Sequence, residues 1–277
     1  MKISCCIFDL DGTLLTSEKH ISDTDKKTLK SLSSTGVKIV IATGRSVHQI
    51  KAYIKELDIS DPIITFNGAL ISTPSTGEVI MKKTFPEGAV RSLEKVLKDD
   101  NLNYFFYTSN RIYYALDCDY SMYQRYYNST LPDEQKIPLY HISEMSAAEY
   151  NDILVVALNN DPVILPELKK KIPEAESLSF LDSGSNIIDI LSCGTSKGEA
   201  IKALASHLDI PLSETVAFGD SQNDETMFEA AGFSVAMGNA YDSLKEKADF
   251  ITKTNDEYGI THALEILFKK KKTFQYK

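Results

Sequence analysis

The segment Phe8-Asp9-Leu10-Asp11-Gly12-Thr13 closes an almost wholly apolar run that begins at Ile3. Such a run is typical of a strand that is buried on both faces of a sheet. Two carboxylates at its end need compensation, because charges are costly near apolar surface and like charges raise each other's pKa. A bound Mg²⁺ would compensate them, since it prefers carboxylate and carbonyl oxygens. An isolated Asp-x-Asp pair, however, is better explained as a solvent-exposed Asp-Gly turn.

Strand and helix patterns alternate along the first ninety residues. A helix capped by Ser22 or Asp23 and ended by Gly36 leads to a second apolar run at 37–42. An amphipathic helix and a third run, at 62–66, follow. This alternation predicts a parallel sheet with helices on both faces, in which ligands bind beyond the carboxyl ends of the strands.

Polar segments follow other predicted strands as well. Thr43-Gly44-Arg45 follows the second run, and its hydroxyl and backbone donors can grip a phosphate where the next helix begins. Gly219-Asp220-Ser221-Gln222-Asn223-Asp224 follows the strand at 215–218, and Lys197 opens a helix pattern. Each has a plain explanation when taken singly: a helix cap, a polar loop, a surface lysine. Together they would meet at one edge of the sheet.

The pattern changes after about residue 83, where aromatic residues become frequent and the order of elements becomes mixed. This predicts a second, α+β module inserted into the first, with alternation resuming after about residue 190. The predicted elements of the module are helices near 87–99 and 118–129 and strands near 103–108, 111–116, 153–158 and 186–191. Those that follow it are helices at 199–208, 224–231 and 259–268 and strands at 215–218, 233–236 and 249–251.

Composition excludes some classes of partner. Thirty Lys and Arg against 39 Asp and Glu give a net charge of −9, which argues against nucleic acid as the main partner. No apolar run reaches the roughly 18 residues that a membrane span needs, and the N-terminal run meets a charge too early for a signal peptide. The four cysteines form no CxxC pair, so we expect reduced thiols and a cytoplasmic protein. Oligomeric state cannot be read from the sequence.

The polar segments, taken in order, resemble the four motifs of the haloacid dehalogenase (HAD) superfamily of phosphatases. The motifs are Phe8 to Leu15, Ala42-Thr43-Gly44-Arg45, Lys197, and Gly219 to Asp224. The large insertion, together with Phe66-Asn67-Gly68-Ala69 and Thr195-Ser196-Lys197-Gly198, resembles the Cof-type branch. The resemblance implies a Rossmann-like, doubly wound α/β core from 1–83 plus 190–277. It also implies an inserted α/β cap at 84–189 that selects the substrate.

The resemblance also implies a role for each motif residue. Asp9 would be the nucleophile that forms an aspartyl-phosphate, and Asp11 would act as an acid and then as a base. Mg²⁺ would be bound by Asp9, the backbone carbonyl of Asp11 and Asp220, with Asp224 near it through water or as an outer-shell partner. The phosphoryl oxygens would be held by Leu10 (through its backbone N–H), Thr43, Gly44, Lys197 and Asn223.

These motifs predict a Mg²⁺-dependent phosphatase that acts on a small phosphorylated metabolite. Sugar phosphates are the first expectation, and cofactor phosphates such as pyridoxal phosphate or flavin mononucleotide the second. A sugar-phosphate mutase or phosphotransferase on the same scaffold is the main alternative, because it would keep both Asp9 and Asp11. A non-catalytic phosphate-binding protein or phospho-receiver is the other alternative, although such a module has no use for an acid/base at Asp11.

Overall fold

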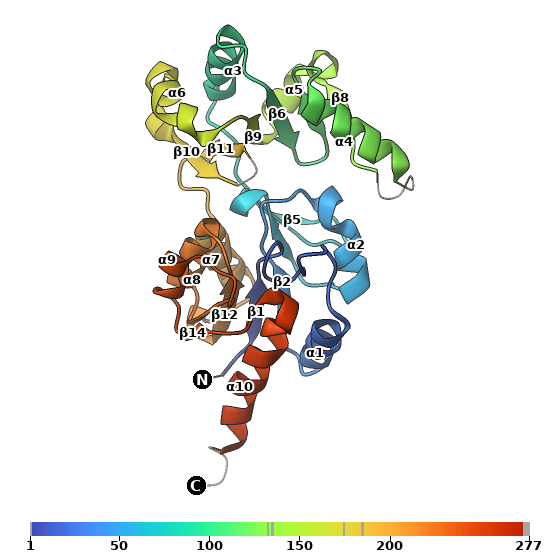
Figure 1. Ribbon diagram of the computed structural model, residues 1–277, viewed down its shortest axis with the longest axis vertical. Helices are drawn as coiled ribbons and strands as arrows, with labels where there is room; N and C mark the ends of the chain where they lie inside the picture. The colour runs from blue at the N-terminus through green and yellow to red at the C-terminus, as the bar shows by residue number, and fades with distance from the viewer. Residues whose placement is uncertain (1, 132, 134–135, 174, 184–185, 274–277) are drawn as a thin grey trace. The chain divides into compact units, whose positions relative to one another are not determined.

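The computed structural model describes residues 2–131, 133, 136–173, 175–183 and 186–273. The chain divides into two compact units (Figure 1). Unit 1 comprises Met1–Thr43, Tyr53–Met81 and Ser196–Lys277, and unit 2 comprises Gly44–Ala52 and Lys82–Thr195. Helix α2 (Val47–Leu57) crosses the boundary between them. The predicted insertion at 84–189 lies within unit 2, which also contains 82–83, 190–195 and part of α2.

A five-stranded sheet in the order β14-β13-β12-β1-β2 forms the centre of unit 1. Its neighbouring strands are all parallel, so their carboxyl ends meet at one edge. Every residue of β1 is buried, as the apolar run predicted. The strands are β1 (Cys5–Phe8), β2 (Lys38–Ile41), β12 (Thr215–Gly219), β13 (Phe233–Ala236) and β14 (Phe250–Ile251).

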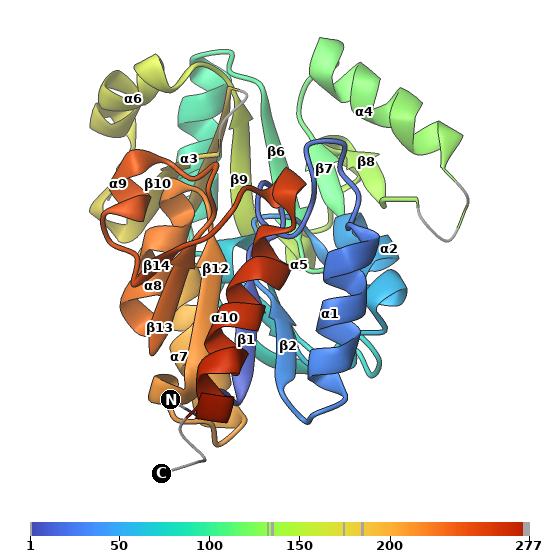
Figure 2. The same cartoon turned by 60° about the horizontal axis from the view of Figure 1, so that its bottom comes forward.

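Helices cover both faces of this sheet. Helices α1 (Asp23–Ser33) and α10 (Gly259–Thr273) lie on one face, and α7 (Lys197–His207) lies on the other (Figure 2). Cys5 and Ile7 of β1 pack in one core cluster with Ile201 and Leu204 of α7 and with Met227 of α8 (Glu225–Ala230). A short helix, α9 (Asp242–Lys245), precedes β14. The predicted doubly wound α/β core is confirmed, and α10 continues past its predicted end at Phe268.

One buried carboxylate joins α1 to α10. Ser22 is the N-cap of α1, and its hydroxyl oxygen accepts from the Asp25 N–H at 3.0 Å. The Asp25 side chain in turn accepts from the Thr261 N–H at 3.0 Å and from the Thr261 hydroxyl at 2.7 Å, in the first turn of α10. Asp25 therefore stabilises the beginnings of two helices at once.

The third apolar run forms β3 (Ile63–Thr65), which pairs antiparallel with β4 (Leu70–Ser72) in a small sheet that also holds β5 (Val79–Lys82). One parallel bridge, between Ala42 and Ile64, connects β3 to the end of β2. Asn67-Gly68, a dipeptide that favours tight turns, joins β3 to β4 in a 3₁₀ turn, Phe66–Gly68.

Unit 2 contains a six-stranded sheet in the order β10-β11-β9-β6-β7-β8, with α3 and α6 packed on one face (Figure 1). Its pairs are antiparallel, except that β7 runs parallel to β8. The sequence did not predict β8, β10, α5 or α6. The helices are α3 (Ala89–Asp99), α4 (Asp119–Thr130), α5 (Ala147–Tyr150) and α6 (Leu165–Lys171). The strands are β6 (Tyr104–Thr108), β7 (Ile112–Tyr114), β8 (Leu139–His141), β9 (Ile153–Asn159), β10 (Leu178–Asp182) and β11 (Ile187–Ser192).

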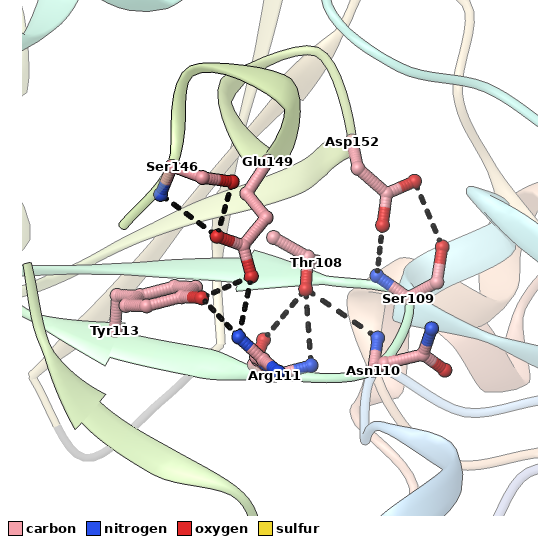
Figure 3. Close-up of polar contacts among 8 residues, drawn as sticks. All are labelled: Thr108, Ser109, Asn110, Arg111, Tyr113, Ser146, Glu149 and Asp152. Atoms are coloured by element: carbon pink, nitrogen blue, oxygen red, sulfur yellow. Dashed lines mark hydrogen bonds and ion pairs between the residues drawn. The ribbon is translucent and has the colours of Figure 1, made fainter. Parts of the chain in front are cut away.

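Carboxylates fix the hairpin between β6 and β7 (Figure 3). Asp152 accepts from both the N–H and the hydroxyl of Ser109 at 3.0 Å, and it forms an ion pair with Lys82 at 2.6 Å. Glu149 forms an ion pair with Arg111 at 2.9 Å and accepts from the hydroxyl of Tyr113. The turn is thus bound to α5 by Glu149 and to the segment between α5 and β9 by Asp152.

Candidate active site

Asp9 lies where β1 ends, and its position follows from the parallel register of the sheet. Its N–H donates to the Phe218 carbonyl of β12 at 2.9 Å, so Asp9 is still hydrogen-bonded to the neighbouring strand although it follows the last residue of β1. The carbonyl oxygens of Asp9 and Leu10 accept from the N–H groups of Leu14 and Leu15, at 3.2 and 2.8 Å. These bonds fold the motif into a tight turn that leaves Asp9 only 5% exposed.

The Asp-Gly-Thr turn is fitted to Asp220, which follows β12. Gly12 has a φ of +80°, and a Cβ added there would lie 2.3 Å from Asp220 Oδ2. Only glycine fits both this conformation and this contact. The Thr13 hydroxyl donates to Asp220 Oδ1 at 2.7 Å. The first and fourth motifs are therefore in direct contact.

Lys197 lies between two of the carboxylates. Ser196 caps α7, which makes Lys197 the first residue of the helix. Its Nζ donates to Asp9 Oδ1 at 2.5 Å and to Asp224 Oδ1 at 2.7 Å, and its side chain has no exposed surface. The surface-lysine alternative is therefore wrong. The cation is buried because it has two buried anions as partners.

Asp224 closes the loop that follows β12. Its Oδ2 accepts from the N–H groups of Asp220 and Ser221, at 2.9 and 3.0 Å. A Cβ added at Gly219 would lie 2.6 Å from the Asp224 Cβ, so glycine is required where the carboxylate folds back. One oxygen of Asp224 thus fixes the loop, while the other contacts Lys197.

The cluster carries more negative than positive charge. Ligand oxygens of Asp9, Asp220 and Asp224 lie within 4.8 Å of one another, against the single positive charge of Lys197. Burial raises the pKa of Asp9 well above its ordinary value; Lys197 opposes this effect, and the other two carboxylates add to it. Burial also raises the pKa of Asp220 to about 6, although the hydrogen bond from Thr13 acts in the opposite direction.

Burial alone would lower the pKa of Lys197, but the charges of Asp224 and Asp9 outweigh it and the pKa is raised. The two carboxylates therefore favour the charged form of Lys197. Three carboxylates and one ammonium leave a net charge of −2 when all four groups are ionised, which one divalent cation would neutralise. The residues fit a Mg²⁺ ion in number, charge and ligand type.

Asp11 has different surroundings from Asp9. Its side chain is 40% exposed, and its Oδ1 accepts from Lys19 Nζ at 2.8 Å. Lys19 has a φ of +61° and its carbonyl accepts from the Tyr53 hydroxyl at 3.0 Å, so the backbone that presents this ammonium is held in place. Lys19 was not predicted as a site residue. Its positive φ cannot be predicted from the sequence.

The remaining predicted phosphate ligands follow neighbouring strands. The N–H of Thr43 donates to the Ile64 carbonyl at 2.9 Å, which ties the residue after β2 to β3. Leu10 has a fully buried side chain. Asn223 donates from Nδ2 to Asn67 Oδ1 at 3.0 Å. Gly44, the next residue after Thr43, belongs to unit 2.

A family model described as haloacid dehalogenase-like hydrolase matches residues 6–264. The chain belongs to this family. The predicted resemblance to Cof-type HAD phosphatases is confirmed, as is the expectation of a hydrolase. In the described part of the chain, no helix is long and apolar enough to cross a membrane.

Relatives of the chain include proteins named as phosphatases. The 5-amino-6-(5-phospho-D-ribitylamino)uracil phosphatase YwtE of Bacillus subtilis is 31% identical, over 96% of this chain and 98% of that protein. Among solved structures, the HAD phosphatase BT1666 from Bacteroides thetaiotaomicron is 28% identical with a TM-score of 0.80, over 95% of this chain and 94% of that one. The HAD subclass IIB sugar phosphatase BT4131 is 26% identical with a TM-score of 0.79, over 95% and 98%.

Proposed function

We propose that the chain is a Mg²⁺-dependent phosphatase that hydrolyses small phosphate monoesters through an aspartyl-phosphate on Asp9. The observation that carries this proposal is the fully buried Lys197, which contacts both Asp9 and Asp224. Phosphoryl transfer depends on positioning and charge neutralisation. The buried Asp9 carboxylate is held beside the Lys197 ammonium, and these surroundings suit a nucleophile for such a transfer.

In the first step an oxygen of Asp9 attacks phosphorus and the ester P–O bond breaks. The leaving alkoxide takes a proton from Asp11. Lys197, the Thr43 hydroxyl and the Asn223 amide donate to the phosphoryl oxygens as negative charge develops there. Bound Mg²⁺, held by Asp9, the Asp11 carbonyl and Asp220 with Asp224 near, would supply further charge neutralisation.

In the second step Asp11 takes a proton from water, whose oxygen attacks the phosphorus of the aspartyl-phosphate. The bond from phosphorus to the Asp9 oxygen breaks, and phosphate is released. The exposed position of Asp11 beside Lys19 suits this step, because an ion pair favours the ionised carboxylate that acts as a base. For the first step Asp11 must be protonated, and its ion pair with Lys19 is then absent.

We further propose that unit 2 is the inserted cap and that the substrate carries its phosphate on a polyhydroxylated carbon chain. This feature is common to the names of two relatives, since YwtE is named for a phosphorylated ribityl chain and BT4131 for sugar phosphates. Sugar phosphates therefore stay the first candidates and cofactor phosphates the second. The predicted cytoplasmic location and the absence of a nucleic-acid partner stay predictions.

A phosphate-release screen over sugar, ribityl and pyridoxal phosphates, with Mg²⁺ and with EDTA, tests the proposal. We expect turnover with Mg²⁺, none with EDTA, and none for Asp9→Asn. The matched control is Asp242→Asn, whose side chain is 96% exposed on α9. Turnover that survives chelation or Asp9→Asn contradicts the mechanism. In single-turnover experiments with ³²P-labelled ester, Asp11→Asn should slow the loss of the label from the protein.

A further inference from the structure

The turn between β3 and β4 has a backbone conformation that residues with side chains rarely adopt. Its three residues have successive positive φ angles, +53° at Phe66, +54° at Asn67 and +100° at Gly68. For a bulky residue such as phenylalanine this is a true outlier. Strained backbone of this kind persists only where the surroundings fix it, and it is concentrated at functional sites.

The turn contacts the segments that carry three of the proposed phosphate ligands. The Asn67 N–H donates to the Thr43 carbonyl at 3.0 Å, and its side-chain oxygen accepts from Asn223 Nδ2 at 3.0 Å. A Cβ added at Gly68 would lie 2.2 Å from the carbonyl oxygen of Ser196, the residue before Lys197. Asn67 itself is only 1% exposed, so its polar side chain lies in the interior of the protein.

Both ends of the Asn223 amide are held by neighbours. Ser221 Oγ donates to its oxygen at 2.5 Å, and its nitrogen donates to Asn67 at 3.0 Å. An amide nitrogen carries two N–H groups, so one remains for a ligand. If the amide turned over, its oxygen would face a phosphoryl anion and repel it, and the hydrogen bond to the Asn67 side-chain oxygen would be lost.

We propose that Asn67 is a positioning residue of the phosphate site, which fixes the Asn223 amide so that it offers an N–H to the phosphoryl group. The inference rests on the proposed function, in which Asn223 binds phosphoryl oxygens. It gives the Phe66-Asn67-Gly68 turn a reason for its backbone strain, because this path brings the Asn67 side chain to Asn223 while its N–H bonds to Thr43.

The test is Asn67→Gly, which removes the side-chain acceptor and keeps a residue that adopts positive φ freely. We expect the dissociation constant of inorganic phosphate, measured by calorimetry with Mg²⁺ present, to rise about tenfold. We expect kcat/KM to fall by a similar factor. In an Asn223→Ala background the same substitution should change phosphate affinity by less than about twofold, because the side chain through which it acts is absent.

Asn101→Gly is the matched control, since Asn101 has a φ of +52° and is exposed in unit 2. It should leave phosphate affinity unchanged. If Asn67→Gly does not fold, Ser221→Ala serves instead, because it releases the other end of the amide. Wild-type phosphate affinity in Asn67→Gly, or equal losses with and without Asn223, overturns the proposal. A wild type that binds phosphate but cleaves no ester contradicts the proposed function and leaves this binding test intact.

Discussion

Replacing Lys197 by methionine removes the only cation that contacts Asp9 and Asp224 in the described part of the chain. The charge of the cluster, with its carboxylates ionised, changes from −2 to −3, and two buried carboxylates lose their partner. Breaking a buried ion pair from one side costs about 3–5 kcal/mol. In a domain of this size each kcal/mol lowers the melting temperature by about 2–4 °C, so we expect a fall of about 6–20 °C.

Thermal unfolding in EDTA near neutral pH measures this loss without a bound metal. Lys202→Met on the same helix is the matched control, because Lys202 is 52% exposed and its ion pair with Glu199 lies at the surface. It should change stability by less than about 0.5 kcal/mol. The double variant Lys197→Met/Asp224→Asn should regain part of the loss, since it removes one of the unpaired charges.

Excess Mg²⁺ should also restore part of the stability of Lys197→Met, because a cation that binds only the folded state stabilises it. A Lys197→Met melting temperature within about 2 °C of wild type in EDTA contradicts this prediction. A Lys202→Met variant that loses as much stability as Lys197→Met refutes it as well. Turnover should be lost in Lys197→Met even at temperatures where the variant is fully folded.

Three further substitutions test other parts of the structure. Asp220→Asn should abolish turnover yet stabilise the EDTA-treated protein by about 1–3 kcal/mol near pH 7. The stability gained by this substitution should vanish by about pH 4. The raised pKa of Asp220 destabilises the folded wild type only where the carboxyl ionises, and this cost grows as the pH rises from about 4 to about 6. Asp152→Ala should cost about 1–2 kcal/mol and speed hydrogen exchange at Ser109, measured by mass spectrometry. Asp25→Ala should cost about 2–3 kcal/mol in urea unfolding, whereas Asp23→Ala, 87% exposed, should change little.

Most strands and helices of unit 1 were predictable because each is specified by local pattern, whereas the four-residue helix α9 was not predicted. The apolar run before Asp9 forms a buried strand. Ser22 caps α1, and the residues that follow it repeat with the period of a helix. In unit 2 the sequence missed β8 and β10, whose residues are mostly half-buried and have no continuous apolar run. Short strands of this kind form because a neighbouring strand supplies hydrogen bonds, which local pattern does not record.

The candidate site was predictable to the extent that parallel strands bring their carboxyl ends together. Asp220 and Lys197 were identified from their places after predicted strands. The contributions of Asn67 and Lys19 were not, because both depend on backbone with positive φ. The partner of Asn67 is also 156 residues away in the chain, whereas Lys19 contacts Asp11 only eight residues before it. An Asn-Gly pair such as Asn67-Gly68 favours a tight turn, but it carries no information on what the turn contacts.

The sequence by itself determined which chemical groups are present and at which strand ends they occur, since apolar runs and turn residues act locally. Only the tertiary structure decided how the two carboxylates of the Asp-x-Asp pair differ. Asp9 is buried against Lys197, which lies 188 residues away in the chain, whereas Asp11 faces solvent and Lys19. Desolvation and charge compensation depend on neighbours that the strand order brings together, and two residues apart in sequence can therefore have opposite surroundings.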